Sequence, residues 1–397
     1  MKAKIFAVLN PNLLIIDFFR NLLIFLFQKE SYQLLLKEEC LRQNTNFKEV
    51  YTAFRARSLI YNLLLSLKKA HPDRNQVVLP SYTCKVVVNS ILKAGLDPIF
   101  IDSKKNHFLI ESSDISSAVN DNTLMVFIQH TFGFQQVYDS KFIKSKGVFI
   151  LEDFAHAYLN FEEEKHADFK LLSFGQNKLF SSSYGGVLLT KTQFTINENL
   201  KTLNFLQTFY SHLRSSLMYV VIKTYHFGIG SILAKFLKLN FLALKQVSEI
   251  EKKGHVQNIN YYKLPNSHAY LAYKAIKNYQ NNHFKYREEL FNVYRSNITD
   301  DLQYSNISRQ GLFFPILTQD AKKLYSFMKS KGIYLNLDWT GSNLVPFTKG
   351  FDYLNQNKNF SNSYKTSLHL VGLPVNLQTK VKDALRVSNL INEFYAR

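Results

Sequence analysis

Val148-Phe149-Ile150-Leu151-Glu152-Asp153 opens the stretch of sequence that decides the fold, and the stretch runs on to Val187. Four successive apolar residues are typical of a strand buried on both faces, as the strands of a parallel sheet are. A second apolar run, 169–172, leads into Ser173-Phe174 and then Lys178, and a third, 187–189, follows Gly185-Gly186. Functional residues of such sheets gather where the strands end. We therefore expect Asp153 and Lys178 to belong to one site.

An Asp at the end of one strand and a Lys just after the next match the needs of pyridoxal phosphate chemistry. The carboxylate keeps the pyridine nitrogen protonated, so that the ring acts as an electron sink, and the amine holds the aldehyde as a Schiff base. A single lysine in a loop is ordinarily a solvated charge. The prediction therefore depends on the order of the motifs, with the Glu152-Asp153 strand before Lys178 and the Gly185-Gly186 turn after it.

This order of motifs resembles that of the DegT/DnrJ/StrS family of sugar aminotransferases. The resemblance is carried by Glu152-Asp153-x-Ala155-His156-Ala157, by Ser173-Phe174-x-x-x-Lys178 and by Gly185-Gly186. It implies the fold-type-I architecture of pyridoxal phosphate enzymes. We therefore expect an α/β chain with a three-layer large domain around a mainly parallel sheet, a smaller C-terminal α/β domain, and assembly as a homodimer.

The resemblance also assigns roles within the site. It implies that Lys178 is the catalytic lysine, that Asp153 holds the pyridine nitrogen, that His156 lies against the 3-hydroxyl side of the cofactor, and that Ser173 contacts its phosphate. The family binds this phosphate with backbone amides at the start of a helix, where amides are unpaired and the dipole is positive. The matching residues are Ala56, where the family usually has Gly, then Arg57 and Ser58. The alternative for them is an ordinary helix start with a solvated Arg57.

Two more positions are expected to bind the cofactor, Cys84 and His130. Cys84 stands where the family more often has an aromatic residue that stacks on the pyridine ring, and a cysteine offers no such surface. Tyr82 and His130 are the alternatives for that role, and Cys84 reads equally well as a small buried apolar residue. His130 follows the predicted strand Leu124–Ile128, so we expect it at the carboxyl edge of the sheet, lining the site.

We expect residues 1–50 to be an N-terminal helical segment, 51–253 the large cofactor-binding domain, and 254–397 the small C-terminal domain. Within the large domain, 196–253 reads as an apolar helical insertion with lysines and few acids. Basic amphipathic helices of this kind either pack on a neighbouring subunit or domain or lie on a membrane surface, and we favour packing. The apolar run 13–27 is interrupted by Asp17, Arg20 and Asn21, so it predicts an amphipathic helix and not a signal peptide or a membrane span.

A segment at 262–271 resembles the family segment near which an Asn of the partner subunit reaches the phosphate. Tyr261 occupies the aligned position, and Asn260 lies one residue away. An ordinary N-capped helix explains the segment equally well. Whether either residue makes the contact between subunits stays open at this point.

Charge and cysteine content narrow the class of protein. The 397 residues carry a net charge of +19, spread along the chain without a basic tail or a recognisable nucleic-acid motif, so we do not favour nucleic-acid binding. The charge suits an anionic substrate. Cys40 and Cys84 form neither a disulfide framework nor a metal site by their spacing, which suits the reducing cytoplasm.

The resemblance implies a reaction class. We expect amino transfer from a donor such as glutamate to a keto-sugar, nucleotide-linked, in polysaccharide or glycan biosynthesis, with pyridoxal 5'-phosphate as cofactor. One alternative is a pyridoxal phosphate enzyme of the same fold acting on a non-sugar substrate, because fold does not decide chemistry. The other is a non-catalytic relative that binds a membrane or a partner, which the departures at Ala56, Cys84 and Tyr261 keep open.

Overall fold

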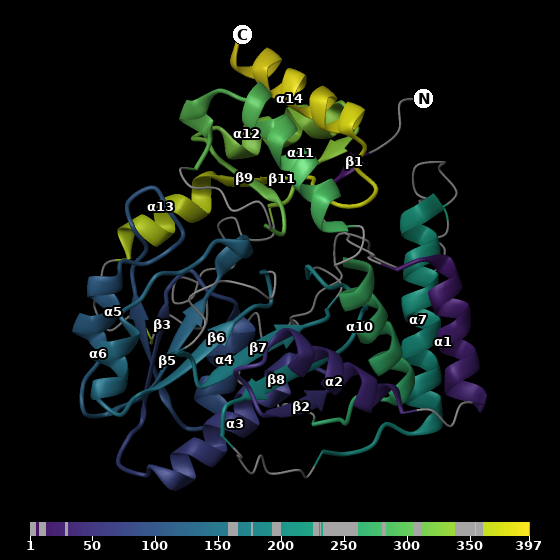
Figure 1. Cartoon of the computed structure of the whole chain (residues 1–397). Coiled ribbons are helices and arrows are strands. Elements are labelled where there is room, and N and C mark those ends of the chain that lie inside the picture. Colours follow the sequence, from purple (N-terminus) through teal and green to yellow (C-terminus); the bar gives the residue numbers. More distant parts are fainter. Residues whose placement is uncertain are drawn as a thin grey trace.

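A computed structural model describes residues 5–7, 13–27, 31–157, 166–175, 178–192, 200–224, 230, 232, 261–279, 283–304, 311–337, 354 and 360–396 of the chain. Asn260 and most of the second half of the expected insertion, 225–253, lie outside these ranges. Figure 1 shows a broad α/β body with a smaller unit of helices and short strands above it.

The body is built on one sheet, whose strands are β2 (Glu49–Ala53), β3 (Gln76–Pro80), β4 (Asp97–Ile101), β5 (Thr123–Gln129), β6 (Phe149–Asp153), β7 (Phe169–Ser173) and β8 (Gly186–Thr190). These seven strands of the described chain follow the order β2-β8-β7-β6-β5-β3-β4. Strands β3 to β7 pair in parallel, while β8 is antiparallel to both β7 and β2. The sheet is therefore mainly parallel, as the sequence predicted. It begins at Glu49, just before the expected start of the large domain.

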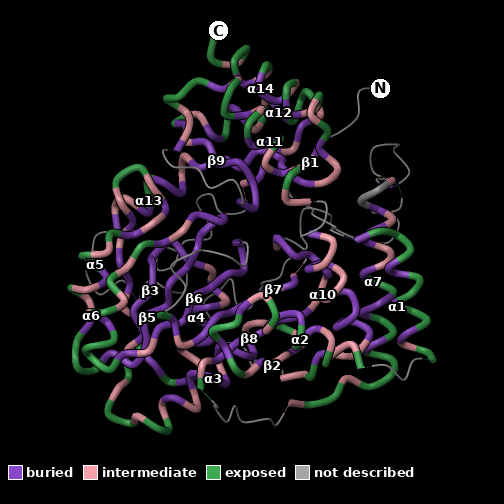
Figure 2. Tube along the Cα trace, viewed as in Figure 1, coloured by how far each residue is buried: buried purple, intermediate pink, exposed green. Residues whose placement is uncertain are grey.

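Helices cover both faces of this sheet, which gives the predicted three layers (Figure 1). Side chains alternate between the faces along each strand. Leu151 and Leu171 pack with the helices α3 (Ala56–Ala70) and α4 (Lys85–Lys93). Ile150 faces the other way, toward α5 (Ser112–Ala118) and α6 (Ser140–Ser145), and Leu172 also faces that side, toward α1, α2 and α10, which are described below. Figure 2 shows the resulting buried interior along the strands. The alternation decides which polar residues can share a site.

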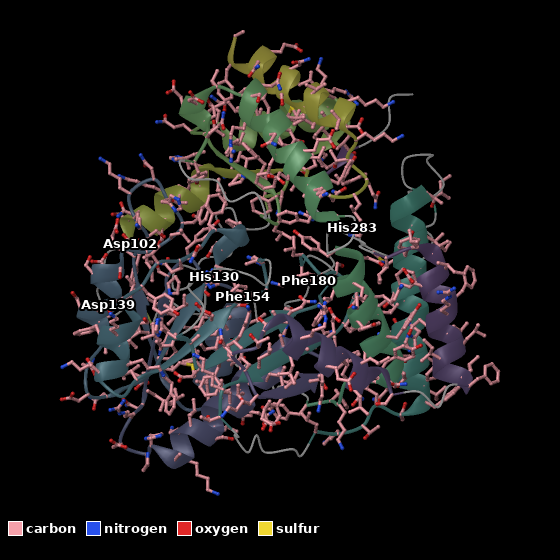
Figure 3. All side chains as sticks on the ribbon, in the orientation of Figure 1. Asp102, His130, Asp139, Phe154, Phe180 and His283 are labelled. Atoms are coloured by element: carbon pink, nitrogen blue, oxygen red, sulfur yellow. The ribbon has the colours of Figure 1, made fainter. Side chains whose placement is uncertain are left out.

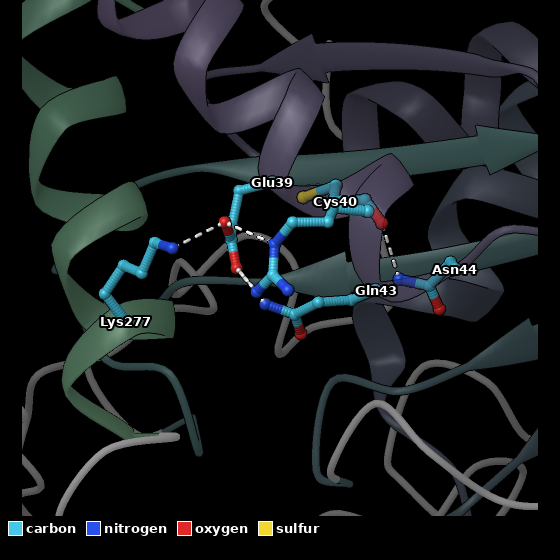
Figure 4. Close-up of polar contacts among 6 residues, drawn as sticks. Glu39, Cys40, Gln43, Asn44 and Lys277 are labelled. Carbon is cyan, nitrogen blue, oxygen red and sulfur yellow. Dashed lines mark hydrogen bonds and ion pairs between the residues drawn. The ribbon is translucent and has the colours of Figure 1, made fainter.

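A cluster around Glu39 joins two helices on the second face. Glu39 lies on α2 (Tyr32–Gln43) and accepts hydrogen bonds from Arg42 and Gln43, and its carboxylate is 2.9 Å from Lys277 Nζ on α10 (Asn266–Asn278) (Figure 4). Burial by itself raises the pKa of Glu39, but these partners outweigh it and lower the pKa to about 2. Helix α10, which we expected in the C-terminal unit, thus packs on the large sheet with α2.

The smaller unit has its own core and combines the two ends of the chain. It contains α11 (Phe284–Asn297), β9 (Phe314–Leu317), α12 (Ala321–Ser330), β10 (Ile333–Tyr334), β11 (Leu370–Leu373) and α14 (Val381–Tyr395). Strand β1 (Ile5–Phe6) pairs in parallel with β10, so an N-terminal segment also belongs to it. Helix α13 (Ser361–His369) reaches down to the large sheet, where Asp102 accepts from the Ser363 amide at 2.8 Å.

Two helices lie side by side at one rim of the body, α1 (Ile15–Phe27) and α7 (Phe205–Thr224) (Figure 1). They run antiparallel, because the Phe18 ring packs on Tyr219 and the Phe25 ring on Phe205. Between these pairs, Asn21 is 2.7 Å from His212. A helix is thus found at both places where the sequence predicted an amphipathic one. In the part of the chain that the structure describes, no helix is both long enough and apolar enough to cross a bilayer.

Candidate active site

A pocket opens at the carboxyl ends of β6 and β7, on the sheet face covered by α3 and α4. Asp153 and Lys178 both line it, and so do Ser173, Cys84 and the first turn of α3 with Ala56 and Arg57. Most of the residues predicted from the sequence therefore surround one cavity. The parallel strands explain this, because their carboxyl ends meet at one edge of the sheet.

The start of α3 offers an anion site. Arg55, the residue before the helix, makes no side-chain hydrogen bond to cap it. The first amides of such a helix have no partner within the helix, and the dipole makes this end positive, which suits a phosphate group. Arg57 adds a cation beside it. Ser58 departs from the expectation: it is buried, its amide donates to the Arg55 carbonyl oxygen at 3.1 Å, and it is not among the residues that line the pocket.

A glycine places this helix start against the sheet. The backbone of Gly186, the first residue of β8, lies so close to Ala56 that a Cβ on Gly186 would overlap the backbone of Ala56. Gly185 precedes it with a φ of +125°, which an L side chain rarely adopts, and its amide donates to the Phe54 carbonyl oxygen at 3.0 Å. The Gly-Gly turn thus brings the α3 amides and the Lys178 loop to the same cavity.

Lys178 contacts a buried imidazole. Its Nζ lies 3.0 Å from Nε2 of His156, whose ring stacks on Phe132 with 5.6 Å between centroids and 7° between planes. Burial first, and then the Lys178 cation, hold the pKa of His156 well below its ordinary value. His156 is therefore neutral near pH 7, and a fixed neutral ring can position the lysine amine by a hydrogen bond without repelling its charge.

Asp153 is a carboxylate that the protein only partly compensates. Burial raises the pKa of Asp153, and the Lys178 cation, the Ala155 amide and His130 offset that increase incompletely. The Ala155 amide donates to Asp153 Oδ1 at 2.8 Å. A carboxylate desolvated in this way gains most from a cationic ligand group, and a protonated pyridine nitrogen is such a group.

His130 lies beside Glu152, on the face of the sheet opposite to Asp153. The side chains of Glu152 and Asp153 point to opposite faces because consecutive residues of a strand alternate. Nε2 of His130 is 3.7 Å from Glu152 Oε1, and its ring packs on Phe154 with 4.4 Å between centroids (Figure 3). Lys170, paired with Glu152 across the strands, has its Nζ 3.9 Å from the centroid of the Phe154 ring. His130 is not among the residues lining the pocket, and it reaches Asp153 only electrostatically and through its amide, which donates to the Asp153 carbonyl oxygen at 3.2 Å.

The stacking role proposed for Cys84 or its alternatives gains no support. Cys84 is half-buried and lines the pocket, but Tyr82 is buried elsewhere, in the core of the smaller unit, edge-on to Phe132. Tyr261 stacks on Tyr61 of α3 within the same chain, with 4.9 Å between centroids and 16° between planes. A role of Tyr261 toward another subunit stays a hypothesis, and Asn260 lies outside the described residues.

The pocket residues that the sequence analysis did not assign to the site include Phe54, Arg55, Tyr184 and Arg214. The rings of Phe54 and Tyr184 stack with 4.4 Å between centroids, and the Arg55 guanidinium lies 5.4 Å from the centroid of Tyr184. Arg55 and Tyr184 are adjacent in sequence to predicted motifs, so their place in the site could have been predicted. Arg214 had none, because it comes from α7, in the segment interpreted as an insertion.

The fold and the site residues fit one class of enzyme. The three-layer architecture is that of the fold-type-I pyridoxal phosphate enzymes, and the donor set fits that cofactor: an uncapped helix start with Arg57 for a phosphate, Asp153 for a pyridine nitrogen and Lys178 for an aldehyde. Residues 57–207 match the model of the DegT/DnrJ/EryC1/StrS aminotransferase family. The resemblance seen in the motifs is thereby confirmed.

Individual relatives agree with this family match. A GDP-perosamine synthase of Escherichia coli O157:H7 is 28% identical over 126 residues, which are 30% of this chain and 34% of that protein. The matched segments of this and a second curated relative thus span only about a third of those proteins. Among solved structures, Helicobacter pylori PseC, an aminotransferase of pseudoaminic acid biosynthesis, covers 100% of both chains with a TM-score of 0.72 and 16% identity. DesI in the presence of its TDP-sugar product has a TM-score of 0.68, 13% identity, and coverage of 100% of this chain and 95% of that one. At these identities the structures establish the fold.

Proposed function

We propose that the protein is a pyridoxal-phosphate-dependent aminotransferase that moves an amino group from a donor such as glutamate to a nucleotide-linked keto-sugar, in polysaccharide or glycan biosynthesis. The observation that carries the proposal is the single pocket shared by Asp153, Lys178 and the uncapped start of α3. The family match over residues 57–207 supports it.

Each residue then has a physical task. The bound cofactor supplies an electron sink for the carbon that gains or loses the amino group. Asp153 keeps the proton on the pyridine nitrogen, because its desolvated carboxylate is stabilised by that positive charge. Lys178 carries the proton to and from the reacting carbon, and His156, 3.0 Å away, positions its amine. The α3 amides and Arg57 hold the phosphate.

The substrate class follows from the charge around the pocket. Among the described residues, Arg55, Arg57, Lys178 and Arg214 line it together with one carboxylate, that of Asp153. Arg57 and the α3 amides would hold the cofactor phosphate, and Arg55 and Arg214 add cationic groups that suit a second anion. The diphosphate of a nucleotide-sugar provides such an anion, and guanidinium groups bind phosphates in two-pronged geometry. The names of the relatives, a GDP-perosamine synthase and an enzyme with a TDP-sugar product, support this substrate class.

We propose further that the enzyme works in the cytoplasm as a homodimer. Both cysteines are unpaired, which suits a reducing compartment. Light scattering on the purified protein would test the dimer, and fractionation of cells would test the compartment.

The test of the reaction starts with the visible spectrum. Protein incubated with pyridoxal phosphate should gain an absorption band that borohydride abolishes, with the reduced cofactor attached to Lys178 in a peptide digest. Lys178→Ala should lack both the band and the attachment, whereas the matched control Lys146→Ala, an exposed lysine near α6, should retain them. A protein that never binds the cofactor would contradict the enzyme proposal and favour a non-catalytic relative. A protein that binds it but aminates non-sugar acceptors would favour the same fold with another substrate.

A further inference from the structure

The rim formed by α1 and α7 is covered by apolar side chains. Among the described side chains that are exposed, those of α1 are all apolar apart from Arg20, and those of α7 are apolar apart from Gln207 and Arg214. Phe27 on α1 and Leu206 on α7 are 76% and 73% exposed. We call this surface the α1–α7 face, and Figure 2 shows its exposed outer side. Contiguous apolar surface of this kind marks a binding site for another surface.

The charges on this face have one sign. The exposed charged side chains that the structure describes on the two helices are Arg20 and Arg214, and Arg214 also lines the pocket. The acid of α1, Asp17, is buried, and its carboxylate accepts a hydrogen bond from Tyr270 at 3.3 Å. A partner that covers this face must therefore tolerate cations and offer apolar surface.

From this combination we propose that the α1–α7 face docks on an anionic membrane surface. An interfacial helix buries an apolar side among the acyl chains while its cations meet anionic headgroups. At about 1.5 Å per residue, the 13 residues of α1 and the 20 of α7 form two rods roughly 20 and 30 Å long. Lying side by side, they present one broad surface to a bilayer. Neither crosses it, in keeping with the lack of a membrane-spanning helix among the described residues. This proposal does not depend on the proposed reaction.

A second copy of the chain is the competing occupant, and charge argues against it. A two-fold contact through this face would cover Arg20 and Arg214 of both copies, with no exposed acid among the described side chains of α1 and α7 to pair with them. The whole chain also carries a net charge of +19, which favours an anionic bilayer.

Co-sedimentation of the full-length protein with vesicles tests the proposal. We expect binding to phosphatidylcholine vesicles that contain about one third phosphatidylglycerol, and weaker binding to pure phosphatidylcholine. Salt at about 1 M should reduce the electrostatic part of the affinity. The triple variant Leu23→Ser, Phe27→Ser, Leu206→Ser removes exposed apolar groups and should reduce vesicle binding by at least about tenfold.

The matched control is Val137→Ser, which removes an apolar side chain that is 58% exposed just before α6, on the other side of the molecule in Figure 1. It should bind vesicles like the unmodified protein, and circular dichroism should show that all variants are folded. Three results would overturn the proposal: no binding to anionic vesicles, equal binding by the triple variant, or equal loss in both variants. The proposal would also be overturned if the unmodified protein did not bind vesicles and the triple variant had a lower molecular mass in light scattering. That result would identify the face as a contact between two copies.

Discussion

Glu152 and Asp153 are consecutive residues of β6, yet their side chains lie on opposite faces of the sheet and have opposite pKa shifts. On the face opposite to the pocket, Glu152 accepts a hydrogen bond from the Tyr138 hydroxyl at 2.9 Å and has His130 and Lys170 beside it. Burial raises its pKa, but these partners outweigh burial, and the pKa is lowered. In the pocket, burial dominates and the pKa of Asp153 is raised.

The difference separates a structural charge from a functional one. The protein itself supplies partners for Glu152 at Oε1, so the cost of burying that charge is offset when the chain folds. The partners of Asp153 offset only part of the cost of burying its charge. A cationic group of a ligand is therefore stabilised by binding there. Poorly compensated charges of this kind are common at functional sites and cost stability.

The largest expected effect follows from removing a partner of Glu152. Lys170→Met should lower the free energy of unfolding by about 3–5 kcal/mol, because it leaves a buried carboxylate without one of its cations. Urea denaturation would measure the loss. The double variant Lys170→Met, Glu152→Gln should recover much of it, since both charges are then gone. A Lys170→Met protein as stable as the original would show that His130 and Tyr138 compensate Glu152 alone.

Asp153→Asn should act in the opposite sense on stability while it damages activity. If Asp153 stabilises a protonated pyridine as proposed, removing its charge should lower kcat by about 10²–10³-fold. The cofactor-free variant should be more stable than the original at pH 7. A carboxyl group with a raised folded pKa contributes stability below its unfolded pKa and loses it as the pH rises through the folded pKa. Thermal unfolding from pH 4 to 8 should therefore show the advantage of the variant growing with pH, and a shrinking advantage would contradict the pKa direction.

Gly186→Ala should disturb the phosphate end of the pocket, at the start of α3, and test that end apart from Asp153. The added methyl group meets the backbone of Ala56, so the start of α3 must move, at a cost of about 1–3 kcal/mol in folding free energy. Equilibrium dialysis should show weaker binding of inorganic phosphate and of pyridoxal phosphate. Unchanged phosphate binding would show that the α3 amides do not hold that group. A suitable control is Gly147→Ala, which has a positive φ but lies away from the pocket.

The smallest effect concerns a third compensated carboxylate, Glu39. Glu39→Gln should cost about 1–2 kcal/mol at neutral pH, because Arg42 and Lys277 lose an ionic partner. A lowered folded pKa contributes stability above the unfolded pKa and loses it as the pH falls toward the folded value. The difference between the two proteins should therefore shrink as the pH drops from about 4.5 to about 2. Chemical denaturation at several pH values would measure it.

Sequence reasoning predicted the sheet and most of the pocket because both follow from local order. Buried strands ending in Asp153 and Ser173 must present those residues at one edge, whatever the surrounding helices do. His130 was expected in the site because it follows the carboxyl end of a strand. The strand end alone does not tell which face a side chain takes, and His130 lies on the face of Glu152. Arg214 and the packing of α10 depend on contacts between distant segments, and no local pattern reports such contacts.

Helix α7 has two neighbours at once, since Arg214 lines the pocket while the adjacent Leu213 is exposed on the rim. Because one helix contributes residues to both places, anion binding in the pocket and binding at the rim can affect each other. If occupation of the rim shifts α7, it must change the affinity of the pocket for an anion, and the anion must then change affinity at the rim by the same factor. Binding of an anion in the pocket and binding at the rim would thus be coupled through α7.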